Sequence, residues 1–102
     1  MAIDVKDLAI ERIEKLLRLA DRIFYENEEL ARRYVSIALA ISRRCRVRIP
    51  VRWRRRICRK CMNILKPGVN CTIRIRSRGG RHLVIRCLKC GFIKRIPLRE
   101  GS

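Results

Sequence analysis

The sequence predicts an α+β protein with an N-terminal antiparallel two-helix hairpin, a basic extended linker and a C-terminal three-stranded sheet. Apolar residues recur at three- and four-residue steps through the first 45 residues, which is typical of amphipathic helices. Further along, short runs alternate with period two between turns that contain glycine or proline, which is typical of strands. We therefore expect helices in residues 1–45, the linker in 46–57, the sheet in 58–97 and a tail in 98–102.

The basic residues are concentrated away from the N-terminus. The 102 residues contain 27 Lys and Arg against 9 Asp and Glu, a formal net charge of +18. Eight of the nine acidic residues and only five of the basic ones lie within residues 1–29, and Glu100 is the single later acid. A surface of one charge sign predicts a polyanionic partner, and we expect nucleic acid rather than a membrane or an acidic protein. No apolar run reaches the about 18 residues of a membrane-spanning helix, and the first residues do not resemble a signal peptide.

The first helix is expected over residues 4–25. Asp4 is placed to cap its N-terminus, and Asp7 lies in the first turn, where a negative charge complements the helix dipole. An apolar stripe follows the spacing of one helix face. Its members are Ala9, Ile13, Leu16, Leu17, Ala20, Ile23 and Phe24.

The second helix is expected from Glu28 to about Arg44, with Asn27 as its N-cap. The short connector at residues 25–27 predicts that the two helices are antiparallel. The apolar stripe of this helix comprises Leu30, Tyr34, Ile37, Ala38, Ile41 and Cys45. Two helices cover only one face of each other, so their remaining apolar residues need either a partner protein or the C-terminal sheet, and we favour the partner.

The linker region is strongly basic, because ten of the 18 residues from Arg43 to Lys60 are Lys or Arg. Residues 46–49 alternate with period two, and Pro50 disfavours helix in the residue before it, so we expect extended chain here. Trp53 lies among arginines, and two interpretations remain open for it. Its ring can stack on an unpaired base, or it can pack at the join between helices and sheet.

Two Cys-x-x-Cys pairs, Cys58 with Cys61 and Cys87 with Cys90, enclose 25 residues. Four thiolates with this spacing are typical of a closed tetrahedral zinc site with a structural role. Gly91 permits the positive φ that the curl around a metal needs. A disulfide framework, a thioredoxin-type redox pair and an open catalytic zinc site explain the spacing less well. We therefore expect one structural Zn²⁺ bound by these four cysteines, in a zinc ribbon.

Three strands of this ribbon are expected over residues 71–77, 82–87 and 92–96, with a tight turn at Gly79 and Gly80. The alternation places Cys71, Ile73 and Ile75 on one face and Thr72, Arg74 and Arg76 on the other. The core of such a sheet is thin, so metal binding and folding are expected to coincide.

The remaining reactive side chains are expected to be structural. Cys45 and Cys71 are predicted to pack as small apolar residues, and His82 is not expected to displace a cysteine from the metal. Residues 30–99 contain no acidic side chain that could serve as a general base or a magnesium ligand. Catalysis by this chain alone is therefore not expected.

The order of motifs resembles the archaeal ribonuclease P protein component 4 family and its eukaryotic nuclear counterpart. The resemblance covers nearly the whole chain, and one departure is Met62 after the first cysteine pair, where many ribbons carry glycine. The matching segments are Arg33–Ala38, Arg46–Pro50, the basic residues before Cys58–Cys61, Leu65–Gly68, Cys87–Gly91 and Arg95–Pro97.

The resemblance implies a non-catalytic, cytoplasmic, RNA-binding subunit of the ribonucleoprotein that removes 5′ leaders from precursor tRNA. In that family the RNA subunit carries the chemistry, and the zinc-ribbon protein pairs through its N-terminal helices with a small Sm-like β-barrel protein. The implied partners are thus ribonuclease P RNA, precursor tRNA and the barrel protein. The alternative function is a ribosomal or transcription-associated zinc ribbon.

Two sets of residues follow from this resemblance. The candidates for the protein partner or the contact between helices are Leu16, Leu17, Ala20, Ile23, Phe24, Tyr34 and Ile37. The candidates for RNA are Arg46, Arg48, Arg52, Arg54, Arg55, Arg56, Lys60, Arg74, Arg76, Arg78, Arg81 and Arg86.

Overall fold

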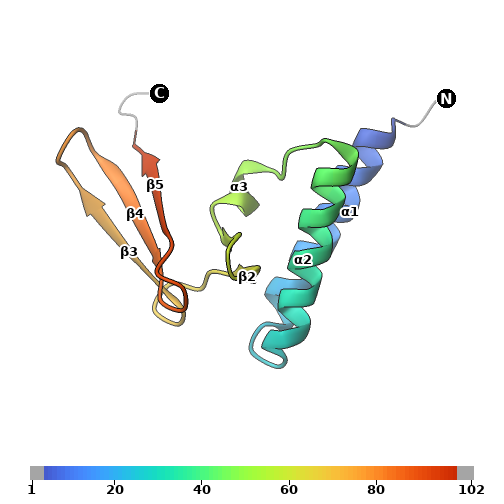
Figure 1. Ribbon diagram of the computed structural model, residues 1–102, viewed down its shortest axis with the longest axis horizontal. Helices are drawn as coiled ribbons and strands as arrows, with labels where there is room; N and C mark the ends of the chain where they lie inside the picture. Colours follow the sequence, from blue (N-terminus) through green and yellow to red (C-terminus); the bar gives the residue numbers. More distant parts are fainter. Residues whose placement is uncertain (1–3, 99–102) are drawn as a thin grey trace. The chain divides into compact units, whose positions relative to one another are not determined.

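The computed structural model describes residues 4–98, so the predicted tail from residue 99 onward lies outside the described residues. The chain divides into two compact units, residues 1–64 and residues 65–102 (Figure 1). The division falls after Ile64, so the first cysteine pair belongs to the same unit as the helices. We describe each unit by itself.

The first unit begins with two helices, α1 (Val5–Ile23) and α2 (Glu28–Cys45), which form the predicted hairpin (Figure 1). Asp4 caps α1 by accepting a hydrogen bond from the N–H of Lys6 at 3.0 Å. Asn27 caps α2 in the same way, through the N–H of Leu30 at 3.1 Å. None of the helices within residues 4–98 is long and apolar enough to cross a membrane.

The linker is not extended as predicted, because it contains a one-turn helix, α3 (Val51–Arg54). The carbonyl of Pro50 accepts hydrogen bonds from the N–H groups of Trp53 and Arg54, both at 2.9 Å. Proline disfavours helix in the residue that precedes it, but its fixed φ suits the start of a helix that follows. Ile49 is not helical, as expected. The expectation of extended chain was wrong beyond Pro50, and it was also wrong at Arg46, which ends α2 in the left-handed conformation with φ +54°.

The hydrophobic core of the first unit is completed by the chain itself. Apolar side chains of the segment 47–64 pack against the helix pair, so the expectation that a partner protein covers this face was wrong for these residues. The segment also contains a small antiparallel pair, β1 (Ile57–Cys58) with β2 (Asn63–Ile64), which was not predicted. The buried core residues are Ala9, Ile13, Leu17, Ala20, Phe24, Ala31, Val35, Ala38, Val47, Ile49, Trp53, Ile57 and Ile64.

The buried face of α2 is rotated from the predicted stripe. Ala31, Val35 and Ala38 are fully buried, whereas Ile37 is 42% exposed. Small side chains let two helices approach closely, so the alanines occupy the contact and the larger aliphatic residues flank it. A stripe chosen by hydrophobicity alone misses this effect of size.

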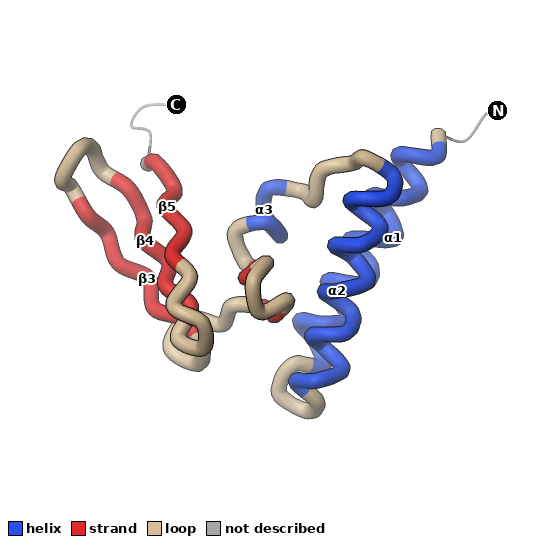
Figure 2. Tube along the Cα trace, viewed as in Figure 1, coloured by secondary structure: helices blue, strands red, loops and turns tan. Residues whose placement is uncertain are grey.

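The second unit is a three-stranded antiparallel sheet of β3 (Cys71–Arg76), β4 (His82–Cys87) and β5 (Ile93–Pro97), in that order (Figure 2). This confirms the predicted ribbon. Gly79 and Gly80 have φ values of +73° and +102° in the turn between β3 and β4, as tight hairpin turns require. The register places Arg74 opposite Val84, and Val84 opposite Arg95, on one face of the sheet.

The core of the first unit yields a test of burial. Replacing Ile49, which is 2% exposed, with alanine is expected to lower the free energy of unfolding by about 2–5 kcal/mol. The same replacement at Ile37, which is 42% exposed, is expected to cost less than about 1 kcal/mol. Denaturant unfolding followed by circular dichroism measures both. Equal losses would contradict the assignment of the core to segment 47–64.

Candidate metal centre and basic surfaces

The first cysteine pair lies in the tight hairpin formed by β1 and β2. Cys58 pairs across the hairpin with Asn63, and Cys61 lies at its tip. Met62 follows Cys61 with φ +55°, a left-handed conformation that side chains rarely adopt. We call residues 58–63 the first knuckle.

The second cysteine pair is built in the same way, in residues 87–92, which we call the second knuckle. The N–H of Cys87 donates to the carbonyl of Phe92 at 2.9 Å, and the N–H of Gly91 donates to the carbonyl of Cys87 at 2.9 Å. Gly91 has φ +76°, so a left-handed residue follows the second cysteine of each pair. Met62 therefore adopts the left-handed conformation although it is not glycine.

The sulfur atoms of Cys58, Cys61, Cys87 and Cys90 all lie within 4.8 Å of one another. No disulfide joins any of the cysteines within residues 4–98. A tetrahedral site with zinc–sulfur bonds of about 2.3 Å places its sulfurs about 3.8 Å apart, so a small contraction of this cluster suits Zn²⁺. Cys58 and Cys87 are buried, whereas Cys61 and Cys90 are partly accessible. The four residues fit a closed, structural metal site.

Two other side chains that can bind metals take no part in this cluster. Cys71 is fully buried and pairs across the sheet with Cys87. Burial raises the pKa of the Cys71 thiol, and the charge of Cys87 raises it further, so Cys71 stays protonated. His82 places its Nδ1 atom 2.8 Å from the carbonyl oxygen of Gly80, in the turn at the far end of β4. Both outcomes agree with the sequence analysis.

One face of the sheet in the second unit carries exposed arginines around a shallow groove. Arg74, Arg76 and Arg86 line this groove together with Val84 and Ile93. We call this surface the arginine face. Because successive residues of a strand point to opposite sides, alternation in β3 predicted the positions of Arg74 and Arg76.

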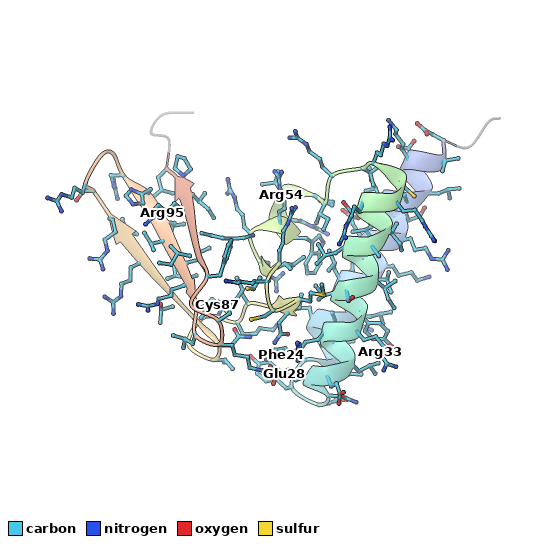
Figure 3. The ribbon with its side chains drawn as sticks, in the orientation of Figure 1. Phe24, Glu28, Arg33, Arg54, Cys87 and Arg95 are labelled. Carbon is cyan, nitrogen blue, oxygen red and sulfur yellow. The ribbon has the colours of Figure 1, made fainter. Side chains whose placement is uncertain are left out.

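The sequence analysis missed Arg95, which lies on the same face. Its partner in the register is Val84, and it lines a second hollow beside Arg76 and His82. Figure 3 labels Arg95 on the sheet. The alternation Ile93, Arg95, Pro97 along β5 is the signal that could have identified it.

Trp53 packs internally, so the base-stacking interpretation was wrong. Its side chain is 4% exposed and belongs to the core of the first unit. The guanidinium carbons of Arg52 and Arg56 lie 5.6 Å and 4.9 Å from the centre of the ring, which indicates cation–π contacts. Arg56 also forms an ion pair with Asp21 at 2.9 Å. The positive charge of Arg56 is therefore partly neutralised by Asp21 within the first unit.

Most of the other predicted RNA-binding residues lie on the surface. Arg54 is the last residue of α3 and is half-buried; Figure 3 labels it there. The remaining exposed candidates are Arg46, Arg48, Arg55, Lys60, Arg78 and Arg81.

The predicted partner-binding residues differ in the surface they offer. Leu17, Ala20 and Phe24 are at most 5% exposed and pack within the first unit. Leu16, Ile23 and Tyr34 are half-buried at the edge of that core. Ile37 is exposed, so it offers the largest fraction of its side chain to a partner.

The fold and the site define a zinc-ribbon protein that carries an N-terminal helical hairpin. Comparison with known proteins identifies its family: residues 12–91 match the RNAse P Rpr2/Rpp21/SNM1 subunit domain. The chain belongs to this family of ribonuclease P subunits. This confirms the resemblance noted in the sequence and favours it over a ribosomal or transcription-associated ribbon.

Individual relatives agree with this assignment. The chain is 51% identical to ribonuclease P protein component 4 of Thermococcus sibiricus over 96 residues, covering 93% of this chain and 80% of the relative. It is 48% identical to the same component of Pyrococcus horikoshii, with the same coverage.

Two solved structures are also similar. A chain in the cryo-EM structure of archaeal ribonuclease P with mature tRNA matches with a TM-score of 0.88 and 42% identity, over 96% of this chain and 82% of that one. A second solved structure carries the description "Pfu Rpp21 structure and assignments". It matches with a TM-score of 0.59 and 44% identity, over 88% of this chain and 99% of that one.

The left-handed residue of the second knuckle yields a test. Nothing lies within 4 Å of a Cβ atom built on Gly91, so replacing Gly91 with alanine adds only backbone strain. A left-handed alanine costs about 1–2 kcal/mol, so the affinity for Zn²⁺ is expected to fall by about 5–30-fold.

The matched control is Gly91→Asn, because asparagine tolerates the left-handed region better than alanine. Its loss of affinity is expected to be smaller. Competition for Zn²⁺ with a chelating dye measures both variants. Equal affinities for the two variants would show that the conformation of residue 91 does not limit metal binding.

Proposed function

We propose that this chain is a non-catalytic, RNA-binding subunit of ribonuclease P that assists the RNA subunit in removing 5′ leaders from precursor tRNA. The observation that carries the proposal is the arginine face of a sheet in a chain of this family. Arg74, Arg76, Arg86 and Arg95 share that face, and the strands hold them at fixed spacing. The RNA ligands in the proposal are ribonuclease P RNA and precursor tRNA.

The chemistry of the arginine face suits a phosphate backbone. A guanidinium group remains charged at physiological pH and donates two parallel hydrogen bonds to one phosphate. The side chains between the arginines, such as Val84 and Ile93, are apolar. No acidic side chain of this face therefore competes with a phosphate for the guanidinium groups. The first unit carries exposed arginines of its own in the linker. Neutralised phosphates allow RNA segments to approach one another, which favours the compact, active RNA.

We also propose that the metal is one structural Zn²⁺, bound by the four cysteines. When bound, Zn²⁺ supplies a fixed tetrahedral cross-link and no open position for a substrate. Cys58 and Cys61 bring the first knuckle to the site, and Cys87 and Cys90 bring the second. The role of the metal is then to hold the sheet that carries the arginine face.

Salt dependence tests the role of the arginine face. Each phosphate contact releases counterions, so replacing Arg74, Arg76 and Arg86 together with alanine is expected to lower the slope of log affinity against log salt by about 2–3. Binding to ribonuclease P RNA is measured between low and moderate salt, with the metal content of each variant confirmed.

The matched control removes the same number of charges from α1, by replacing Arg12, Lys15 and Arg22 with alanine. These residues are exposed but lie outside the arginine face. The control is expected to retain nearly the slope of the wild type. If both triple variants lose the same slope, then total charge rather than the arginine face governs RNA binding.

We propose further that the helical hairpin binds a small Sm-like β-barrel subunit of ribonuclease P. The exposed apolar surface of the hairpin supports this, since Leu16, Ile23 and Tyr34 are only partly buried against the core and Ile37 is exposed. Leu17, Ala20 and Phe24 then contribute indirectly, by holding the two helices together. An apolar edge next to a formed core is typical of a protein interface.

Replacing Ile37 with aspartate is expected to weaken binding of the barrel protein by more than about tenfold, because it places a charge in the apolar contact. Titration calorimetry with the purified barrel protein measures this. The control is Val51→Asp, which makes the same kind of change at a residue that is 49% exposed on α3. Wild-type binding by the Ile37 variant would exclude this face as the interface.

A further inference from the structure

Both knuckles contain a left-handed residue, but only the second has glycine at that position. Both need a left-handed residue after their second cysteine, at φ +55° for Met62 and +76° for Gly91. Glycine adopts this conformation at no steric cost, whereas a residue with a Cβ atom does not. A non-glycine residue stays left-handed only when its surroundings hold it there. The first knuckle therefore needs support that the second does not.

Helix α2 supports the peptide group that directly precedes Met62. The Nε atom of Arg32 donates a hydrogen bond to the carbonyl oxygen of Cys61 at 3.1 Å. This carbonyl belongs to the peptide group that joins Cys61 to Met62. Its orientation is set by the same rotation that places Met62 in the left-handed region. The hydrogen bond therefore favours that orientation of the peptide.

The same helix supports the backbone directly after Met62. The Nδ2 atom of Asn63 donates to Oε1 of Glu28 at 2.9 Å, and its Oδ1 atom accepts from the N–H of Ile64 at 2.9 Å. Asn63 is only 2% exposed, so its amide has exchanged water for these partners. Ile64 is itself fully buried in the core of the first unit. The residue after Met62 is thus fixed by its side chain and by its neighbour.

Glu28 and Arg32 are one helical turn apart, and residues four apart lie on the same face of a helix. Both therefore face the knuckle from one side of α2. Figure 3 labels Glu28 at the first turn of this helix and Arg33 on its other side. Arg33 carries the same charge as Arg32 at the next position, which makes it a suitable control.

We propose that Arg32 and Glu28 are positioning residues for the metal centre, which hold Met62 in the left-handed conformation so that Cys58 and Cys61 are arranged for the metal. Neither residue binds the metal, and both act through the backbone of the first knuckle. In this chain, contacts with α2 stabilise the left-handed residue of the first knuckle, whereas in the second knuckle glycine adopts that conformation without support. The proposal goes beyond the role in RNA binding and does not depend on it.

The first experiment replaces Arg32 with alanine in the full chain. Groups that orient metal ligands typically contribute 10–100-fold to metal affinity, so the affinity for Zn²⁺ is expected to fall by about that factor. Competition with a chelating dye gives the affinity, and the charge-transfer band of the Co²⁺ form reports whether four thiolates still bind. The control Arg33→Ala is expected to bind Zn²⁺ as the wild type does.

The second experiment is a rescue. Glycine at position 62 needs no support to be left-handed, so adding Met62→Gly to the Arg32→Ala variant is expected to restore most of the lost affinity. A loss of helix stability alone would not be restored by this change, so rescue separates the two explanations. Three results would overturn the proposal: full affinity in Arg32→Ala, an equal loss in Arg33→Ala, or a loss that Met62→Gly leaves in place.

Discussion

Four sulfur atoms within 4.8 Å of one another are the constraint on which the rest of this structure depends. Four thiolates this close repel one another strongly unless a cation lies between them. The second unit has little else to hold it, because its buried apolar residues within 65–98 are Leu65, Cys71, Ile85 and Cys87. So small a core does not support a sheet without a further cross-link. We therefore propose that metal binding at this site is coupled to the folding of the ribbon.

The arginines of this chain fall into two groups with different physical roles. Arg32 and Arg56 use their guanidinium groups within the first unit, on the carbonyl of Cys61 and on Asp21. The arginines of β3, β4 and β5 are exposed on the sheet, and these strands contain no acidic side chain. A count of basic residues describes the total field that attracts a polyanion, but the partners of each side chain decide which charges remain for it.

Particular residues show where sequence reasoning succeeds. Sequence reasoning correctly predicted the features that depend on local preference and short-range periodicity. These are the caps Asp4 and Asn27, the turn at Gly79 and Gly80, and the three strands. The cysteine spacing predicted the ligand set for the same reason, since the two residues within each pair fix the turn. Arg95 was missed, although the alternation along β5 carries the same signal as that along β3.

The sequence by itself determined the helices, the ribbon and the four clustered cysteines, because covalent spacing and backbone preference act within a few residues. Only the tertiary structure decided what covers the helical hairpin. Segment 47–64 does so by burying Ile49, Trp53, Ile57 and Ile64, and this turns Trp53 from a candidate for base stacking into a core residue. The contacts of α2 with the first knuckle were decided there too. Such contacts join residues about 30 positions apart, and their partners depend on packing geometry that no local pattern encodes.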